Sequence, residues 1–189
     1  MTTEQDLTSR GRASSLVKAL GDRAPEGLVI ELGSNLPTPQ AVVHDPRASV
    51  PERYYFGVDM IPGPGVDIVG DAARTGLADG SAAMVLALWM LEHARKPHRV
   101  IREARRLLIP DGILVVAVPF IFQIHAFPGD YWRWTPDGVR ELLSPVGPTW
   151  AIPVGAETKP PYVFGVAVRK PASPEMVVMV SQAIEEWSK

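Results

Sequence analysis

The chain has 189 residues, with 19 Lys and Arg, 21 Asp and Glu and no cysteine. This length is typical of one domain, and a formal charge of −2 offers no electrostatic footprint for nucleic acid or an anionic membrane. The lack of cysteine excludes disulfides, thiolate metal sites and a cysteine nucleophile. Because no apolar run reaches membrane-spanning length and the start MTTEQDLTSRGR lacks the pattern of a secretory signal, we expect a soluble, cytoplasmic, single-domain protein over 1–189.

Short apolar segments alternate with turns rich in glycine, proline and acids along the chain. Thr3 and Asp6 resemble a capping pair, and the apolar residues before Gly21 recur at helical spacing. The segment LVIELGSN, 28–35, is typical of a buried strand that ends in an acid and a tight glycine turn. In chain order the pattern predicts helix 1–22, strands 28–35, 54–58, 66–69 and 84–90, a helix from Pro97, strand 113–120, a helix from Pro136, strands 150–154 and 162–168, and a helix from Pro174.

Strands separated by crossovers are typical of a parallel sheet covered on both faces by helices. We therefore expect an α/β fold with a doubly wound, mostly parallel, seven-stranded sheet. Ligands bind such sheets over the carboxyl ends of the strands. Glu31, Gly33, Asp59, Asp71 and Trp89 all fall at these ends, which predicts a small-molecule site there.

The motifs VIELGSN, GVDM, GDA and ALWMLEHARKPHRVIREARRLLIPDGILVVAVPF follow one another in this order. Together they resemble the S-adenosylmethionine-dependent methyltransferases of the seven-stranded, Rossmann-like type. The segment HAFPGDYWRWTPDG is similar to a signature of a small-molecule subgroup of that family, associated with glycan or secondary-metabolite biosynthesis. Two departures are Asn35, where the family usually has a second glycine, and Ala82-Ala83, where relatives commonly have Phe-Asp.

The resemblance implies S-adenosylmethionine as the cofactor, a core for it over 28–120, and an acceptor side with the last strands and helix over 121–189. Glu31 would meet the ammonium of the methionine part, and Asp59 would accept hydrogen bonds from the ribose hydroxyls. Asp71, with Ala72 beside it, would meet the adenine. The expected cofactor-binding residues are Glu31, Gly33, Ser34, Asn35, Asp59, Met60, Asp71, Ala72, Trp89 and Met90.

Methyl transfer is an in-line displacement that depends mainly on positioning, but a hydroxyl acceptor must also lose a proton. His125 is the expected general base because its ordinary pKa lies near working pH, and Asp130 is expected to orient it or to bind the acceptor. The alternative for His125 is an ordinary surface histidine. His93, Tyr131, Trp132 and Arg133 are expected to contact the acceptor, although the aromatic residues could instead hold the loop against the next helix.

We therefore predict an enzyme that transfers a methyl group to a small polar acceptor, most simply to an oxygen. The acids are dispersed and no histidine and carboxylate share ligand spacing along the chain, so we expect no metal, and we expect neither nucleic acid nor a membrane as a partner. Apolar residues beyond one face of the last helix, Val178 and Met179, predict extra core, or alternatively a homodimer contact. Two other functions remain open. The first is a non-catalytic partner that kept the fold, which the departures Asn35 and Ala83 keep open. The second is a nicotinamide-dependent oxidoreductase or epimerase, which is disfavoured because the second and third glycines of the dinucleotide-binding motif are missing.

Overall fold

A computed structural model describes residues 9–36, 45–125, 129–155 and 158–189. It contains one seven-stranded sheet with the order β3-β2-β1-β4-β5-β7-β6. The strands are β1 (Leu28–Leu32), β2 (Tyr55–Asp59), β3 (Ile68–Val69), β4 (Ala82–Leu88), β5 (Leu108–Pro119), β6 (Thr149–Val154) and β7 (Tyr162–Val168). The helices are α1 (Ser9–Gly21), α3 (Pro97–Leu107), α4 (Pro136–Leu143) and α5 (Pro174–Trp187), with short 3₁₀ helices η2 (Pro46–Ser49) and η3 (Leu91–His93).

The sheet is mixed, because β7 pairs antiparallel with both β5 and β6 while β1 to β5 pair parallel with one another. The expected seven strands and their mostly parallel arrangement are confirmed. The structure adds that the last two strands, β6 and β7, form an antiparallel hairpin. A short connection between two neighbouring strands permits only antiparallel pairing, since a parallel pair needs a crossover of a dozen residues or more.

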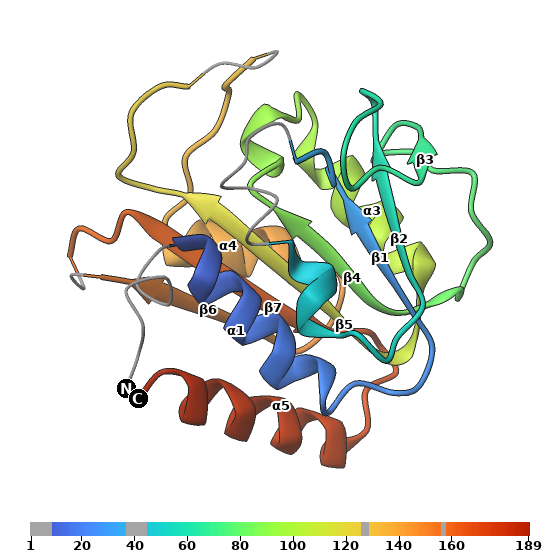
Figure 1. Cartoon of the computed structure of the whole chain (residues 1–189). Helices are drawn as coiled ribbons and strands as arrows, with labels where there is room; N and C mark the ends of the chain where they lie inside the picture. Colours follow the sequence, from blue (N-terminus) through green and yellow to red (C-terminus); the bar gives the residue numbers. More distant parts are fainter. Residues whose placement is uncertain (1–8, 37–44, 126–128, 156–157) are drawn as a thin grey trace.

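Helices cover both faces of the sheet (Figure 1). Helices α3 and α4 pack on one face, where Ile101, Leu107 and Val139 join the side chains of the central strands. Helices α1 and α5 pack on the other face, where Leu16 and Val180 join a second apolar cluster. Since both faces are buried, β4 consists of buried residues throughout its length.

The predicted helix and strand positions are largely confirmed, and the differences lie at the ends of elements. The first strand ends at Leu32 and the fourth at Leu88, so Trp89 and Met90 belong to the turn after β4. The proposed caps Thr3 and Asp6 lie outside the described residues.

Helix α5 buries one side, including Met176 and Ile184, against the sheet. Val178 and Met179 are exposed, so the prediction that they extend the core is wrong. The homodimer contact stays a prediction. No helix among the described residues is long and apolar enough to span a membrane.

Candidate functional site

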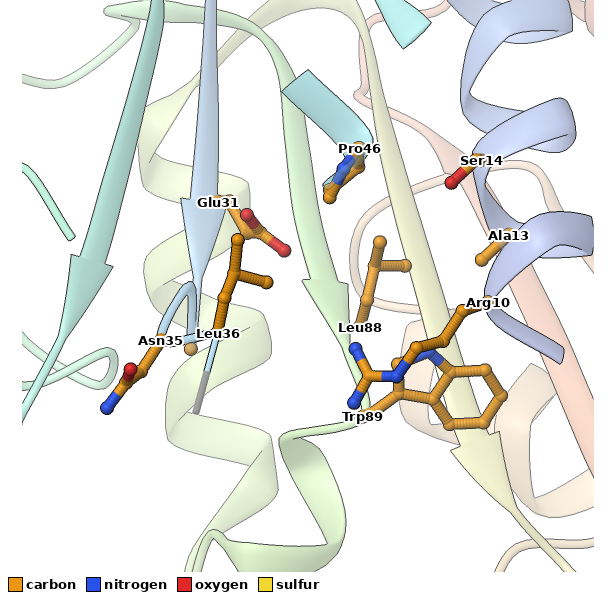
Figure 2. A pocket seen from close by; sticks show the side chains of 10 residues that line it. Arg10, Ala13, Ser14, Glu31, Asn35, Leu36, Pro46, Leu88 and Trp89 are labelled. Atoms are coloured by element: carbon orange, nitrogen blue, oxygen red, sulfur yellow. The ribbon is translucent and has the colours of Figure 1, made fainter. Parts of the chain in front are cut away.

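A cavity lies at the carboxyl ends of β1 and β4, beside the start of α1 (Figure 2). Figure 2 shows the side chains of Glu31 and Arg10 reaching into the same space from β1 and α1. The lining residues are Arg10, Ala13, Ser14, Glu31, Gly33, Asn35, Leu36, Pro46, Leu88 and Trp89. The cavity therefore occupies the position where the sequence predicts a small-molecule site.

Glu31 is the acid that interrupts the apolar pattern of β1. Its side chain is buried, and its Oε2 accepts a hydrogen bond of 2.8 Å from the hydroxyl of Tyr55 on the neighbouring strand β2. Burial raises the pKa of Glu31 to about 7, against the opposing effect of the Tyr55 hydrogen bond. A carboxyl group of this kind is poised to become ionised when a cation enters the cavity.

Arg10 places a positive charge near Glu31. Burial lowers the pKa of the Arg10 guanidinium, while the charges of Glu31 and Glu92 act in the opposite direction. An arginine stays charged in proteins, so the cavity combines a cation with a titratable acid. The sequence reasoning missed Arg10, because nothing in the local pattern of α1 distinguishes it from a solvated helix residue.

Gly33 makes the tight turn after β1 with a φ of 78°. A Cβ at this position would lie 2.5 Å from the Cβ of Met90, so the turn requires glycine for two reasons. The backbone N–H groups of Gly33 and Ser34 both donate to the carbonyl of Val58, at 2.8 and 3.2 Å. These N–H groups are therefore used within the protein and Ser34 itself is buried, while the expected roles of Gly33 and Ser34 toward the cofactor stay predictions.

Asn35 and Asp59 connect the turns that follow β1 and β2. The backbone N–H of Asn35 donates to Oδ2 of Asp59 at 3.1 Å, and the N–H of Ile61 donates to Oδ1 at 2.9 Å. Each carboxylate oxygen keeps a further lone pair, and the side chain remains partly exposed. Asp59 is thus held in place at the strand end where a hydrogen-bond acceptor for the ribose hydroxyls is expected.

The other predicted cofactor residues lie around this edge of the sheet. Asp71 is exposed and accepts from the N–H of Ala73 at 2.8 Å, an arrangement that also serves the local turn. Ala72 packs in the core and Met60 is exposed. Their roles toward the cofactor stay predictions.

Trp89 follows β4 with a φ of 56°, which is uncommon for a bulky residue. Its ring stands edge-on to Tyr162, with centroids 4.8 Å apart, and to Phe164 at 5.9 Å. Such backbone conformations persist only where the surroundings hold them, and they gather at functional sites. Trp89 lines the cavity, and its expected role in binding the cofactor stays a prediction.

A second group of polar residues lies near the carboxyl end of β4. Oε1 of Glu92 lies 3.8 Å from Nε2 of His125 and 4.0 Å from Nε2 of His93. Burial raises the pKa of Glu92 to about 7, and its Oε2 has no hydrogen-bond partner among the described residues. The expectation that no histidine and carboxylate lie at ligand spacing is thus wrong in three dimensions, because η3 and the loop after β5 meet here.

Asp130 lies next to His125 as expected from the sequence. Its carboxylate accepts from the backbone N–H of His125 at 2.9 Å, and its Oδ2 lies 3.3 Å from Nδ1 of the same residue. The carboxylate also pairs with the guanidinium of Arg133, which holds the pKa of Asp130 well below its usual range. The carboxylate therefore orients the imidazole.

Arg133 and Trp132 hold the loop in place. The guanidinium of Arg133 also donates to the carbonyls of Phe122 and Gln123, and the indole N–H of Trp132 donates to the carbonyl of Ala94 at 2.9 Å. The alternative in which this segment fastens the loop is therefore supported for both residues. Tyr131 is exposed, with the guanidinium of Arg95 over its ring at 5.4 Å from the centroid, and its contact with an acceptor stays a prediction.

The fold is matched by known proteins. A family model described as a methyltransferase domain matches residues 51–116. A methyltransferase of Thermotoga maritima dependent on S-adenosylmethionine superimposes with a TM-score of 0.61 at 18% identity, covering 84% of this chain and 89% of that chain. The chain has the methyltransferase fold.

Other proteins with the methyltransferase fold superimpose equally well. A 1,6-didemethyltoxoflavin-N1-methyltransferase of Burkholderia thailandensis, solved with 1,6-didemethyltoxoflavin and S-adenosylhomocysteine, gives a TM-score of 0.64 at 15% identity, covering 85% of this chain and 78% of that chain. An S-adenosylmethionine-dependent methyltransferase of Archaeoglobus fulgidus gives 0.63 at 12% identity, covering 85% and 95%. No curated protein matches the sequence. The low identities restrict the structural likeness to the fold.

Proposed function

We propose that this protein transfers a methyl group from S-adenosylmethionine to a small polar acceptor, with a hydroxyl oxygen as the receiving atom. One observation carries the proposal: a buried acid, Glu31, and a half-buried cation, Arg10, line one cavity at the carboxyl ends of β1 and β4. The amino-acid part of the cofactor carries an ammonium and a carboxylate. The two side chains therefore supply the opposite charges that this part requires.

The residues around the cavity fit the remaining parts of the cofactor. Asp59 offers carboxylate lone pairs to a diol at the end of β2, and Gly33 lines the cavity beside Glu31. When bound, S-adenosylmethionine supplies an electrophilic methyl group on a sulfonium. The protein then has to hold the acceptor in line and to exclude water from the reacting atoms.

Aromatic rings connect the cavity to the proposed acceptor side. Trp89 contacts Tyr162, and Phe122 contacts both Tyr162, with centroids 5.5 Å apart, and His125, at 5.2 Å. We place the acceptor against this apolar surface with its hydroxyl toward His125. This arrangement suits a compound with one apolar face and several polar groups, such as an intermediate of glycan or secondary-metabolite biosynthesis.

His125 is the proposed general base. Its Nδ1 faces two acceptors, Oδ2 of Asp130 at 3.3 Å and the carbonyl of Gln123 at 3.2 Å, so Nδ1 carries the hydrogen and Nε2 is free to accept a proton. The negative charge of Asp130 would stabilise the imidazolium that forms. We expect His125→Ala to lower turnover while leaving affinity for S-adenosylhomocysteine nearly unchanged.

Calorimetry tests the cofactor half of the proposal. We expect the protein to bind S-adenosylhomocysteine and not NAD, and we expect Arg10→Gln and Asp59→Ala each to weaken binding by roughly tenfold or more, since each removes a charged partner. Arg12→Gln is the matched control, because Arg12 lies on the same helix but stacks on Trp187. A wild-type protein that binds no adenosyl ligand would refute the proposal, and binding without turnover on any hydroxyl acceptor would favour the non-catalytic alternative.

A further inference from the structure

We propose that Glu92, His93 and His125 bind a divalent transition-metal ion. Their ligand atoms all lie within 4.8 Å of one another. The inference concerns the acceptor side of the site and does not depend on the cofactor assignment, because none of the three residues lines the cavity between β1, β4 and α1.

The distances fit a metal site better than a set of hydrogen bonds. Nε2 of His125 and Nε2 of His93 lie 3.8 and 4.0 Å from Oε1 of Glu92, which is too far for a hydrogen bond. Ligands at about 2.0 to 2.2 Å from a tetrahedral zinc ion lie roughly 3.3 Å from one another. The side chains would have to approach one another by roughly 0.5 to 1.5 Å, which small changes of side-chain torsion provide.

Both imidazoles present the correct nitrogen. Nδ1 of His93 lies 2.6 Å from the carbonyl oxygen of Gly129. A carbonyl only accepts, so Nδ1 carries the hydrogen and Nε2 keeps its lone pair. His125 has the same arrangement, because its Nδ1 faces Asp130 and the carbonyl of Gln123. Metal-binding histidines in proteins are oriented in this way, by a carbonyl or a carboxylate behind the ring.

The groups behind His125 are themselves fixed. Asp130 is almost completely buried, with 2% of its side chain exposed, and pairs with the guanidinium of Arg133 through both oxygens. The Arg133 guanidinium is in turn bonded to the carbonyls of Phe122 and Gln123. The ring of His125 is therefore held at the point where the loop after β5 meets η3.

Glu92 provides an independent indication of a cation. Only 2% of its side chain is exposed, and its Oε2 is buried without a hydrogen-bond partner among the described residues. A buried carboxylate oxygen without a partner is costly, and a bound cation would remove this cost. Arg133 is paired with Asp130 and acts on Glu92 only through its charge. Arg10 is therefore the protein cation that would compete with a metal ion for Glu92.

The ligand set indicates the kind of ion. Two imidazole nitrogens and one carboxylate oxygen suit Zn²⁺, Fe²⁺ or Co²⁺ better than Mg²⁺ or Ca²⁺, which prefer oxygen ligands. Three protein ligands leave a position open, as in catalytic rather than structural sites. In the metal-bound protein His125 would be a ligand. The hydroxyl oxygen of the methyl acceptor would then contact the metal ion and not the imidazole of His125.

Titration with Zn²⁺ by calorimetry and the visible absorption of bound Co²⁺ test the proposal on the full chain freed of metal by a chelator. We expect one ion per chain, and a loss of affinity of roughly tenfold or more in Glu92→Gln, His93→Ala and His125→Ala. His98→Ala is the control, because His98 is exposed on α3 and should leave affinity unchanged. We expect Arg10→Gln to leave Zn²⁺ affinity unchanged or to raise it.

Two results would overturn the metal site. The first is a wild-type chain that binds less than one Zn²⁺ and gives no Co²⁺ absorption. The second is a fall in affinity in His98→Ala as large as that in His93→Ala. Folding of each variant is followed by circular dichroism, and S-adenosylhomocysteine binding is measured on the same samples. A wild-type chain that binds S-adenosylhomocysteine but not Zn²⁺ would refute this inference alone. A wild-type chain that binds Zn²⁺ but not S-adenosylhomocysteine would refute the proposed cofactor alone.

Discussion

Replacing Glu31 by glutamine tests the electrostatics of the cavity directly. The pKa of Glu31 is about 7 in the folded protein, against 4.5 for an unburied glutamate, because burial disfavours the charged form. The folded state therefore binds a proton more tightly than the unfolded state. The contribution of Glu31 to stability is fully retained below pH 4.5 and declines as the pH rises from 4.5 through 7.

The expected change in the free energy of unfolding follows from the shift in the pKa of Glu31. One pKa unit corresponds to about 1.4 kcal/mol, so the full loss is roughly 3 kcal/mol, and about 2.5 kcal/mol of it falls between pH 5 and pH 8. The glutamine side chain of the variant does not titrate. The free energy of unfolding of Glu31→Gln, relative to wild type, should accordingly rise by roughly 2 to 3 kcal/mol from pH 5 to pH 8.

Urea unfolding at pH 5, 6, 7 and 8 measures this difference. Glu52→Gln is the control, because Glu52 is exposed and its difference from wild type should not vary with pH. A pH-independent difference for Glu31→Gln would show that the carboxylate is ionised in the folded protein throughout, and it would refute the account of Glu31 as an acid that awaits a cation.

Three further predictions concern the turn after β1 and the loop after β5. Gly33→Ala should abolish S-adenosylhomocysteine binding and should lower the midpoint of thermal unfolding more than Gly76→Ala does. Both glycines have a positive φ, but only a Cβ at position 33 would meet another residue, Met90. Equal effects of the two substitutions in calorimetry would contradict the role of the Met90 contact. Asp130→Asn should lower the free energy of unfolding in urea by about 1 to 3 kcal/mol, since it leaves the partly buried guanidinium of Arg133 without a counter-charge. The same variant should lower turnover as well, because His125 loses the carboxylate behind its ring, and unchanged kinetics would separate Asp130 from the reaction.

The positions of the helices and strands could be predicted because they depend on local patterns. Alternating turns and apolar runs located the seven strands, and prolines at the first helical position located the starts of α3, α4 and α5. The same patterns put Glu31 and Asp59 at strand ends. Since the carboxyl ends of parallel strands meet at one edge, the position of the site followed from the order of the elements.

The tertiary structure decided which of these residues have free groups and which do not. The N–H groups of Gly33 and Ser34 donate to the carbonyl of Val58 on the neighbouring strand, and the guanidinium of Arg133 donates to Asp130 and to three carbonyls. Such bonds depend on strand register and on loop packing, which no local pattern contains.

The sequence by itself determined the fold class and the edge of the sheet at which the cavity lies, because strand length, turns and strand-end acids are encoded in neighbouring residues. Only the tertiary structure brought Arg10 from α1 to Glu31, and Glu92 and His93 from η3 to His125. These contacts join segments far apart in the chain, and each of the residues by itself resembles an ordinary surface or loop residue. The charge pair of the cavity and the proposed metal site therefore emerge only when α1, β1, η3 and the loop after β5 are packed together.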